Sequence, residues 1–233
     1  MIRVLFSPRK ALAIALPLLL SACASTGDGS SAPTPQLVRQ RAEDDALKSV
    51  GSDPVQMYAA RTDGGFEIPA IDVQKLNPQY VRQVVSYPSE EKPGTIVVDQ
   101  NSRFLYLIQP GNKAIRYAVG VGPVARSFDG GEAIIARMAA WPRWIPTPDM
   151  VKRNPAHYGP HKDGVDGGPK NPMGARALYM HKDNKDTYYR VHGTNDPSSI
   201  GKGVSAGCIR MMNQDVMDLY ERVTPGAKII VKG

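Results

Sequence analysis

A histidine and a cysteine lie in one glycine-rich stretch that runs from His192 to Arg210. A nucleophilic cysteine needs a base that takes its proton and a pocket that stabilises the anion formed on the attacked carbonyl. His192 is the candidate base for Cys208, because a nearby imidazole or cation lowers the pKa of a thiol from its usual value of about 8.5. Glycines between them allow the tight bends that would bring the two side chains together. The pattern predicts acyl-transfer chemistry, and its glycines are Gly193, Gly201, Gly203 and Gly207.

A single cysteine is more often a small buried apolar residue with no chemical role. That interpretation fits Cys208 poorly, because Ser205-Ala-Gly precedes it and the charged Arg210 follows, which would make a poor core segment. The chain has two cysteines, and the other, Cys23, is expected to carry lipid. Cys208 then has no disulfide partner within the chain, and an exported protein has little structural use for such a thiol.

Three neighbours of the cysteine are candidates for supporting roles. The backbone amides around Gly207 and Cys208 are candidate oxyanion donors, since a glycine lets the reacting carbonyl approach closely. Arg210 could pair with a substrate carboxylate through its planar fork, or form a structural ion pair that holds the loop. Ser205 could contact the substrate or stabilise a local turn.

The first residues have the pattern of an export signal. Arg3, Arg9 and Lys10 precede an apolar run over residues 11–20, which is too short for a mature membrane span. The signal ends in Leu20-Ser-Ala-Cys23, which resembles the lipobox of bacterial lipoproteins, where the cysteine becomes the first mature residue and carries lipid. We therefore expect a signal peptide over 1–22 and a periplasmic protein anchored to a membrane by Cys23, with the outer membrane favoured.

The rest of the chain divides by composition. Residues 23–36 are rich in Ser, Thr, Gly and Pro and cannot bury a core, so they predict a flexible tether. Residues 37–93 form an N-terminal extension, with a short helix over 37–50 and prolines that interrupt any longer element. Residues 94–233 carry the chemistry and form the expected catalytic domain.

The catalytic segment predicts a mainly β fold. From Gly94 onward, runs of branched and aromatic residues are separated by Gly, Asn and Pro, as in consecutive antiparallel strands. We expect a curved antiparallel sheet or β-sandwich with a few short helices. One helix is predicted to follow Asn213 as its cap and to end at Thr224-Pro-Gly, before a closing strand.

A proline- and glycine-rich stretch from Trp141 to Pro172 predicts a lid or binding loop, or else a solvated insertion without a catalytic role. Its His157 and His161 are four residues apart, but the pattern lacks the accompanying ligands of a zinc site. We expect no metal and no cofactor. The net charge is +7, yet no basic block is interleaved with aromatics, so no nucleic-acid partner is expected.

The segment from about Gly94 to Lys232 resembles the YkuD-type L,D-transpeptidase catalytic domain, a family of bacterial cell-wall enzymes. The resemblance covers about sixty per cent of the chain, and its motifs occur in the family's order. These motifs are Asn171-Pro-Met-Gly, Ala177-Leu-Tyr, His192-Gly-Thr-Asn, Ser199-Ile-Gly, Ser205-Ala-Gly-Cys-Ile-Arg-Met, and Asp215 ahead of Leu219-Tyr220.

The resemblance implies a two-step reaction on peptidoglycan stem peptides. The cysteine attacks the carbonyl of meso-diaminopimelate and expels the terminal D-alanine, and an amine then resolves the thioester. That amine comes from a second stem peptide or from a wall-attached protein. In the family a backbone carbonyl beside the histidine often orients its ring, which points to Gly193. Two alternatives stay open, namely hydrolysis of the same bonds by an L,D-carboxypeptidase or amidase, and a catalytically silent wall-binding lipoprotein.

Overall fold

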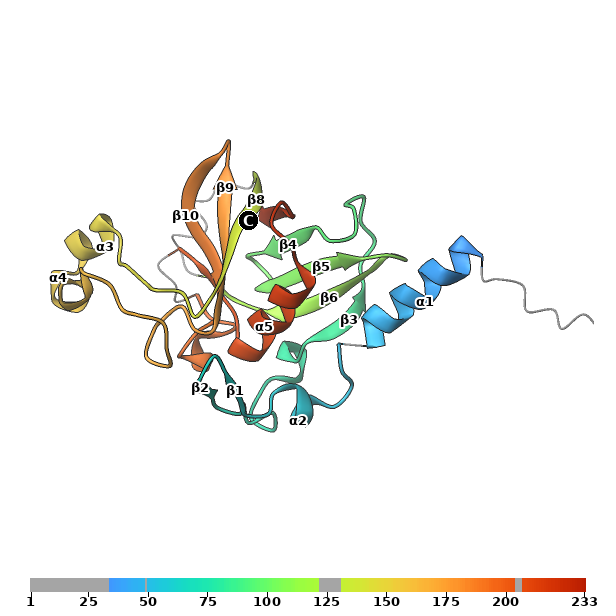
Figure 1. Cartoon of the computed structure of the whole chain (residues 1–233), viewed down its shortest axis with the longest axis horizontal. Helices are drawn as coiled ribbons and strands as arrows, with labels where there is room; N and C mark the ends of the chain where they lie inside the picture. Colours follow the sequence, from blue (N-terminus) through green and yellow to red (C-terminus); the bar gives the residue numbers. More distant parts are fainter. Residues whose placement is uncertain (1–33, 49, 122–130, 204–206) are drawn as a thin grey trace, which may run out of the picture.

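A ten-stranded sheet forms the centre of the protein (Figure 1). The computed structural model describes residues 34–48, 50–121, 131–203 and 207–233. Across the sheet the strands follow the order β3-β6-β5-β4-β12-β8-β9-β10-β11-β7. Their bounds are β3 Gln83–Ser86, β4 Ile96–Asp99, β5 Phe104–Gln109, β6 Lys113–Ala118, β7 Gly120–Val121, β8 Gly131–Ala140, β9 Arg176–Lys182, β10 Lys185–His192, β11 Ile209–Arg210 and β12 Lys228–Lys232.

Branched and aromatic residues favour strands, and they predominate in the central strands because both faces of the sheet are buried there. In β4, Ile96, Val97 and Val98 are all fully buried, so the strand is a continuous apolar run rather than an alternating one. The β5–β6 hairpin turns at Gly111 and Asn112, whose φ values of 71° and 56° suit a glycine and an asparagine.

The prediction of a mainly β fold is confirmed, and the sheet is mixed. Most neighbouring strands are antiparallel, as expected, but β12 runs parallel to β4 and β11 runs parallel to β10. β4 and β12 are far apart in the sequence, and β10 and β11 are joined by a loop too long for a hairpin turn, so no local turn pattern could predict either parallel pair.

Short helices surround the sheet. α5 (Asn213–Arg222) buries Val216 and Leu219 against the main core and crosses the middle of the molecule in Figure 1. Among the described residues, none of the helices is both long and apolar enough to cross a bilayer. The remaining elements are α1 Pro35–Lys48, α2 Pro54–Met57, α3 Pro148–Arg153, α4 Pro155–Tyr158 and the 3₁₀ turns η1 Pro78–Tyr80, η3 Gly159–His161 and η4 Pro197–Ser199.

The predicted cap of α5 is wrong. The residue before the helix is Met212, and no side chain caps this end. The Asn213 side chain reaches across to the sheet instead, where its Oδ1 accepts a hydrogen bond of 3.0 Å from the backbone N–H of Ala175. An asparagine at a helix start usually caps the helix with its side-chain oxygen, but here the Asn213 oxygen accepts from Ala175 instead.

Residues before the expected catalytic domain are packed into it. β3 pairs with β6 at one edge of the main sheet. A small hairpin of β1 (Arg61–Asp63) and β2 (Phe66–Ile68) contacts the other half of the molecule, where Asp63 receives two hydrogen bonds of 2.7 and 2.8 Å from Arg176. The segment therefore joins both halves of the sheet.

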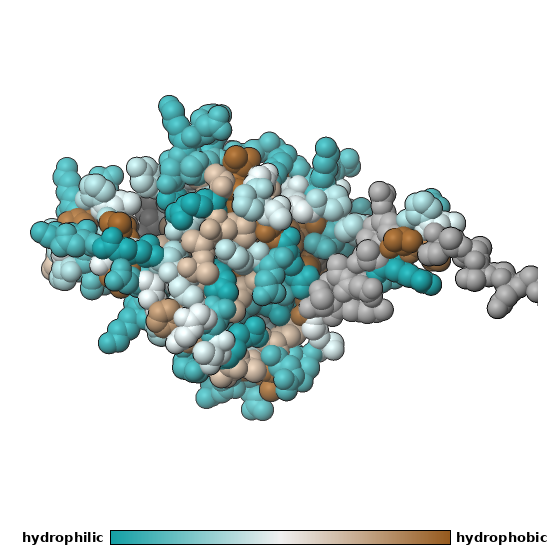
Figure 2. Space-filling model, in the orientation of Figure 1, coloured by the Kyte–Doolittle hydropathy of each residue, from teal (hydrophilic) through white to brown (hydrophobic). Residues whose placement is uncertain are grey.

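The outer surface is mainly hydrophilic on the face shown in Figure 2, with small separate hydrophobic patches. Leu37 and Val38 of α1 are about half exposed. Scattered apolar residues of this kind are usual on a protein surface.

Candidate active site

The parallel pairing of β10 with β11 sets His192 beside the short strand that directly follows Cys208. Val191 pairs with Ile209, and His192 pairs with Arg210. Side chains alternate along a strand and neighbours in register share a face, so His192 and Arg210 lie on the same side of the sheet. Cys208 immediately precedes β11, two residues before Arg210, and is hydrogen-bonded to the backbone of Arg190 on β10. The charges of Arg190 and Arg210 lower the pKa of both His192 and Cys208.

His192 is held in one orientation by its own chain. The side chain is 5% exposed, and its Nδ1 lies 2.5 Å from the carbonyl oxygen of Gly193. The neutral ring therefore carries its proton on Nδ1, where it donates to that carbonyl, and leaves Nε2 as an acceptor. The contact is at the Gly193 carbonyl, where the family resemblance placed it.

Burial determines the charge of the histidine. Loss of solvent lowers the pKa of His192 to about 4, the charges of Arg210 and Arg190 lower it further, and backbone contacts with Gly193 and Met173 oppose the shift. The imidazole is consequently neutral at pH 7 and able to accept a proton.

Cys208 is partly exposed at the surface of this face. Burial raises the pKa of its thiol, while a contact with the Arg190 backbone and the charges of Arg190 and Arg210 lower it. The thiol is therefore protonated at rest, beside a neutral base. This differs from the expectation that the histidine would lower the thiol pKa, because a neutral imidazole does not stabilise a thiolate by its charge.

Two glycines of the predicted site occupy positions that other residues fit poorly. Gly207 has a φ of 132°, a conformation that other residues rarely adopt, and it directly precedes the cysteine. A Cβ on Gly193 would lie 2.2 Å from Asn213 Oδ1, so this turn passes directly beside the start of α5. The glycines thus fix the backbone on either side of the cysteine and histidine pair.

Arg210 is half-buried on the same face as His192. Among the described residues, no carboxylate lies within ion-pair distance of its guanidinium. The structural ion pair considered for this arginine therefore has no partner in that part of the chain. Ser205 and Cys23 lie outside the described residues.

The chain between the histidine and the cysteine packs as an ordered loop as far as residue 203. Ser199 Oγ donates a 2.6 Å hydrogen bond to the Asp196 carbonyl. Gly201 donates its N–H to Val119 and accepts a 2.6 Å hydrogen bond from Arg103. The loop is thus fixed to the strands that lead into β7, the neighbour of β11.

The predicted lid, residues 141–172, contains α3, α4 and η3 and closes at its base on Asn171. The Asn171 amide is 1% exposed and donates to the carbonyls of Pro142, Val165 and Asp166 at 2.9, 2.9 and 3.1 Å. Its Oδ1 accepts from Met173 N–H at 2.8 Å. This role was not predicted from the sequence, because an asparagine beside a proline usually indicates only a turn.

Apolar residues at the base of the lid cover the sheet beside His192. Met173 and Trp144 pack with Ala139, Ala177 and Tyr179. His157 is in ring contact with Tyr158, and His161 with Trp144. Among the described residues, no cluster of three or more His, Cys, Asp or Glu side chains could hold a metal.

Sequence reasoning missed Arg190, which lies two residues before His192 on β10 and so shares its face. Its guanidinium pairs with Asp186 through two contacts of 2.7 and 2.8 Å and lies 4.4 Å from the ring centroid of Tyr179. The period of two along a strand was the signal that could have identified it.

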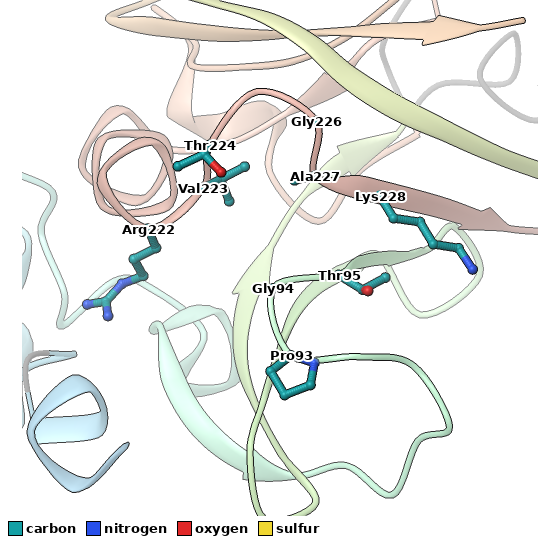
Figure 3. Close-up of a pocket in the computed structure, with 9 residues that line it drawn as sticks. All are labelled: Pro93, Gly94, Thr95, Arg222, Val223, Thr224, Gly226, Ala227 and Lys228. Carbon is teal, nitrogen blue, oxygen red and sulfur yellow. The ribbon is translucent and has the colours of Figure 1, made fainter. Parts of the chain in front are cut away.

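A separate pocket lies at the end of α5 (Figure 3). The residues that line it come from the end of α5, the turns before β4 and β12, and the first residue of β12, and none of the candidate site residues is among them. Its two cations, Arg222 and Lys228, point away from each other in Figure 3, and their partners are Asp218 for the first and Glu91 and Glu132 for the second.

Comparison with known proteins assigns the sheet-forming segment. The family model described as YkuD, L,D-transpeptidase catalytic domain, matches residues 93–231. The probable L,D-transpeptidase YbiS of Escherichia coli (strain K12) is 31% identical over 150 residues, which are 64% of this chain and 47% of YbiS. The chain thus spans about half the length of that relative.

Two further matches differ in extent. The probable L,D-transpeptidase ErfK/SrfK of the same Escherichia coli strain is 28% identical over 227 residues, 97% of this chain and 70% of that protein. A crystal structure described as a probable carnitine operon oxidoreductase from Brucella melitensis is 50% identical, covers 66% of this chain and 94% of its own, and has a TM-score of 0.47. That TM-score supports no structural argument, and the description refers to that protein alone.

Proposed function

The chain belongs to the YkuD-type L,D-transpeptidase catalytic-domain family, and from this premise we propose that it is a cysteine-dependent L,D-transpeptidase acting on peptidoglycan stem peptides. In the first half-reaction, the Cys208 sulfur attacks the diaminopimelate carbonyl while His192 Nε2 takes the thiol proton. The tetrahedral intermediate then collapses, the bond to D-alanine breaks, and His192 returns the proton to the leaving amine.

The second half-reaction uses the same two residues in reverse. An acceptor amine attacks the thioester carbonyl and gives a proton to His192, and the sulfur leaves and regains that proton. A new amide bond forms and the enzyme returns to its starting state. The acceptor is a second stem peptide or an amine of a wall-attached protein.

The protonation states of His192 and Cys208 support transfer of the thiol proton during attack, and not a thiolate–imidazolium ion pair that exists before the substrate binds. With the pKa of His192 lowered to about 4 and the pKa of the Cys208 thiol raised, both groups are neutral before attack. The thiol proton moves as the carbon–sulfur bond forms, and the charges of Arg190 and Arg210 favour the anionic sulfur. The backbone amides of Gly207 and Cys208 are the proposed oxyanion donors, and losing one such donor costs about a hundredfold or more in rate.

The observation that supports the proposal is the β10–β11 register, which pairs His192 with Arg210, two residues after Cys208. The test is intact-protein mass spectrometry after mixing with a tetrapeptide donor or a carbapenem. We expect a single adduct on the wild-type protein and none on Cys208→Ala. An adduct of equal yield on that variant would refute the assignment.

Product analysis separates transfer from hydrolysis, because both pass through the same thioester. Transfer predicts cross-linked dimers from tetrapeptide muropeptides, whereas hydrolysis predicts tripeptide monomers alone. A protein that gives neither product nor adduct would be the silent wall-binding lipoprotein.

The location is a proposal that the lipobox sequence supports. We propose that the mature protein is held by lipid on Cys23 in the periplasm, with the outer membrane favoured, and that the tether lets the catalytic domain reach the wall. Metabolic labelling with a clickable fatty acid should mark the wild-type protein and not Cys23→Ala. Equal labelling of both would exclude this anchor.

A further inference from the structure

Three side chains form a row across three neighbouring strands on the face that carries His192. Arg137 of β8 pairs with Tyr179 of β9, and Tyr179 pairs with Arg190 of β10. The Arg137 Cζ lies 3.5 Å from the centroid of the Tyr179 ring and the Arg190 Cζ lies 4.4 Å from it. Tyr179 is 7% exposed, so its ring is held between two guanidinium groups that come from the strands on either side.

A bulge in β10 adds a carboxylate to this row. The register shifts between Asp186 and Arg190, and Tyr188 within the shift has a φ of 61°. The extra residues let Asp186 face Arg190, and the pair is bidentate. The side chain of Asp186 stays 38% exposed, and that of Arg190 is 12% exposed.

Burial alone would raise the pKa of Asp186, but hydrogen bonds from Arg190 and the Tyr188 N–H, with the charges of Arg190 and His181, lower it. Asp186 is therefore ionised at neutral pH. Arg137 is exposed, and among the described residues no carboxylate pairs with it. We call Arg137, Tyr179, Arg190 and Asp186 the guanidinium strip.

The strip ends beside the nucleophile. β11 follows β10 in the sheet, and the Arg190 backbone contacts Cys208. Strands lie about 4.8 Å apart, so Tyr179 is roughly 10 Å from β11 across the sheet. A substrate bound to Cys208 can therefore place a long, extended side chain along the strip.

We propose that the guanidinium strip binds the zwitterionic end of the diaminopimelate side chain, with Arg137 pairing its carboxylate and Asp186 its ammonium. Two guanidinium groups and one carboxylate leave a net positive strip, and Arg210 adds a further cation to the same face. A side chain that ends in an ammonium alone, such as lysine, could still pair with Asp186 but would bring no carboxylate for Arg137 into a strip of net positive charge. The inference rests on the proposed function, because it requires a stem peptide on Cys208.

The test compares two donors that differ in one group. One is the tetrapeptide with a free diaminopimelate side-chain carboxylate, and the other carries a carboxamide there. The rate constant kcat/KM for acyl-enzyme formation is measured by intact-protein mass spectrometry for the wild type and for Arg137→Gln. Arg116→Gln is the matched control, since Arg116 also stacks on a ring, that of Phe104 at 4.5 Å, but on β6 in the other half of the sheet.

We expect amidation to lower the wild-type rate about tenfold or more, as for a lost charge-assisted hydrogen bond. Arg137→Gln should lose a similar factor on the free acid and almost nothing on the carboxamide, so its preference falls close to one. Arg116→Gln should keep the wild-type preference. A merely structural role for Arg137 would slow both donors equally and leave the ratio unchanged.

The unfavourable outcomes are distinct. Equal rates on both donors for the wild type, or an unchanged ratio in Arg137→Gln, would overturn the strip while leaving the transpeptidase proposal intact. No acyl-enzyme from either donor would overturn the proposed function, and the strip with it.

Discussion

Two groups of titratable side chains in this protein differ in the partners of their polar atoms. In the first, which we call the Arg82 cluster, Tyr58, Arg82 and Asp215 are all under 9% exposed and bond to one another. Asp215 accepts from the Tyr58 hydroxyl at 2.9 and 3.1 Å and from Arg82 at 3.1 Å. Arg82 also reaches the carbonyls of Val50 and Gln214, so the cluster joins the N-terminal segment to α5.

The second cluster, at the candidate active site, is left chemically open. His192 uses Nδ1 on Gly193 and keeps Nε2 as an acceptor, while Cys208 is partly exposed. Charged side chains that bond to one another hold an element in place, whereas a neutral imidazole and a thiol can take part in a reaction. The two clusters should therefore respond to substitution in opposite ways, one in stability and the other in rate.

Cys208→Ala should separate the two clusters most strongly. Acyl-enzyme formation should fall at least about a thousandfold, because no other group supplies the attacking atom. The urea midpoint should stay close to that of the wild type, since the thiol is partly exposed. A large loss of stability would mean that the site also holds the fold together.

Arg82→Ala should have the opposite profile. It leaves Asp215 buried without its cation, which typically costs about 3–5 kcal/mol. Equilibrium urea unfolding should show this loss, while the acylation rate of the molecules that remain folded stays near wild type. The double variant Arg82→Met with Asp215→Leu should lose less than the sum of the two single variants, because both charges are gone. Strict additivity would contradict the coupling.

The pH dependence sharpens the contrast at His192. Its pKa falls from 6.5 to about 4 on folding, so between these values the unfolded chain binds more protons and stability rises with pH. Stability should therefore be lost as the pH drops from about 6.5 to about 4, by roughly 2–3 kcal/mol from this residue.

Urea unfolding of the wild type and of His192→Gln over this range isolates the contribution of the histidine. The variant's stability must be subtracted from that of the wild type at each pH, because Asp215 also titrates in this range. Burial raises the pKa of Asp215 to about 7, so its contribution to stability falls as the pH rises in both proteins. The two stability curves should converge toward pH 4. Parallel curves would mean that the histidine keeps its ordinary pKa in the fold.

The smallest expected effect concerns Asp63, which joins the β1–β2 hairpin to the sheet. Arg176 is the main group that lowers the Asp63 carboxyl pKa, and Trp141 also donates to this carboxylate at 2.7 Å. Asp63→Asn should cost about 1 kcal/mol, since the pair is only partly buried. Hydrogen exchange should become faster in residues 61–68 and stay unchanged in β4. Unchanged exchange in the hairpin would show that the ion pair contributes nothing there.

The sequence by itself predicted a cysteine-based chemistry and determined most of the strands. A cysteine after Ser-Ala-Gly, with a histidine upstream, predicted a nucleophile and its base, and runs of branched and aromatic residues separated by Gly, Asn and Pro predicted β4, β5 and β6. These features depend on residue type and short-range spacing, which a linear pattern records directly.

The tertiary structure decided how the residues meet. The parallel pairing of β10 and β11 brings Arg190 to the site, the start of α5 requires a glycine at 193, and Asn213 bonds to Ala175 instead of capping its own helix. It also set the pKa of His192, because burial and the nearby arginines depend on residues that pack around the ring. Contacts between distant segments lie outside any local pattern, since their free energy arises only when the whole sheet forms.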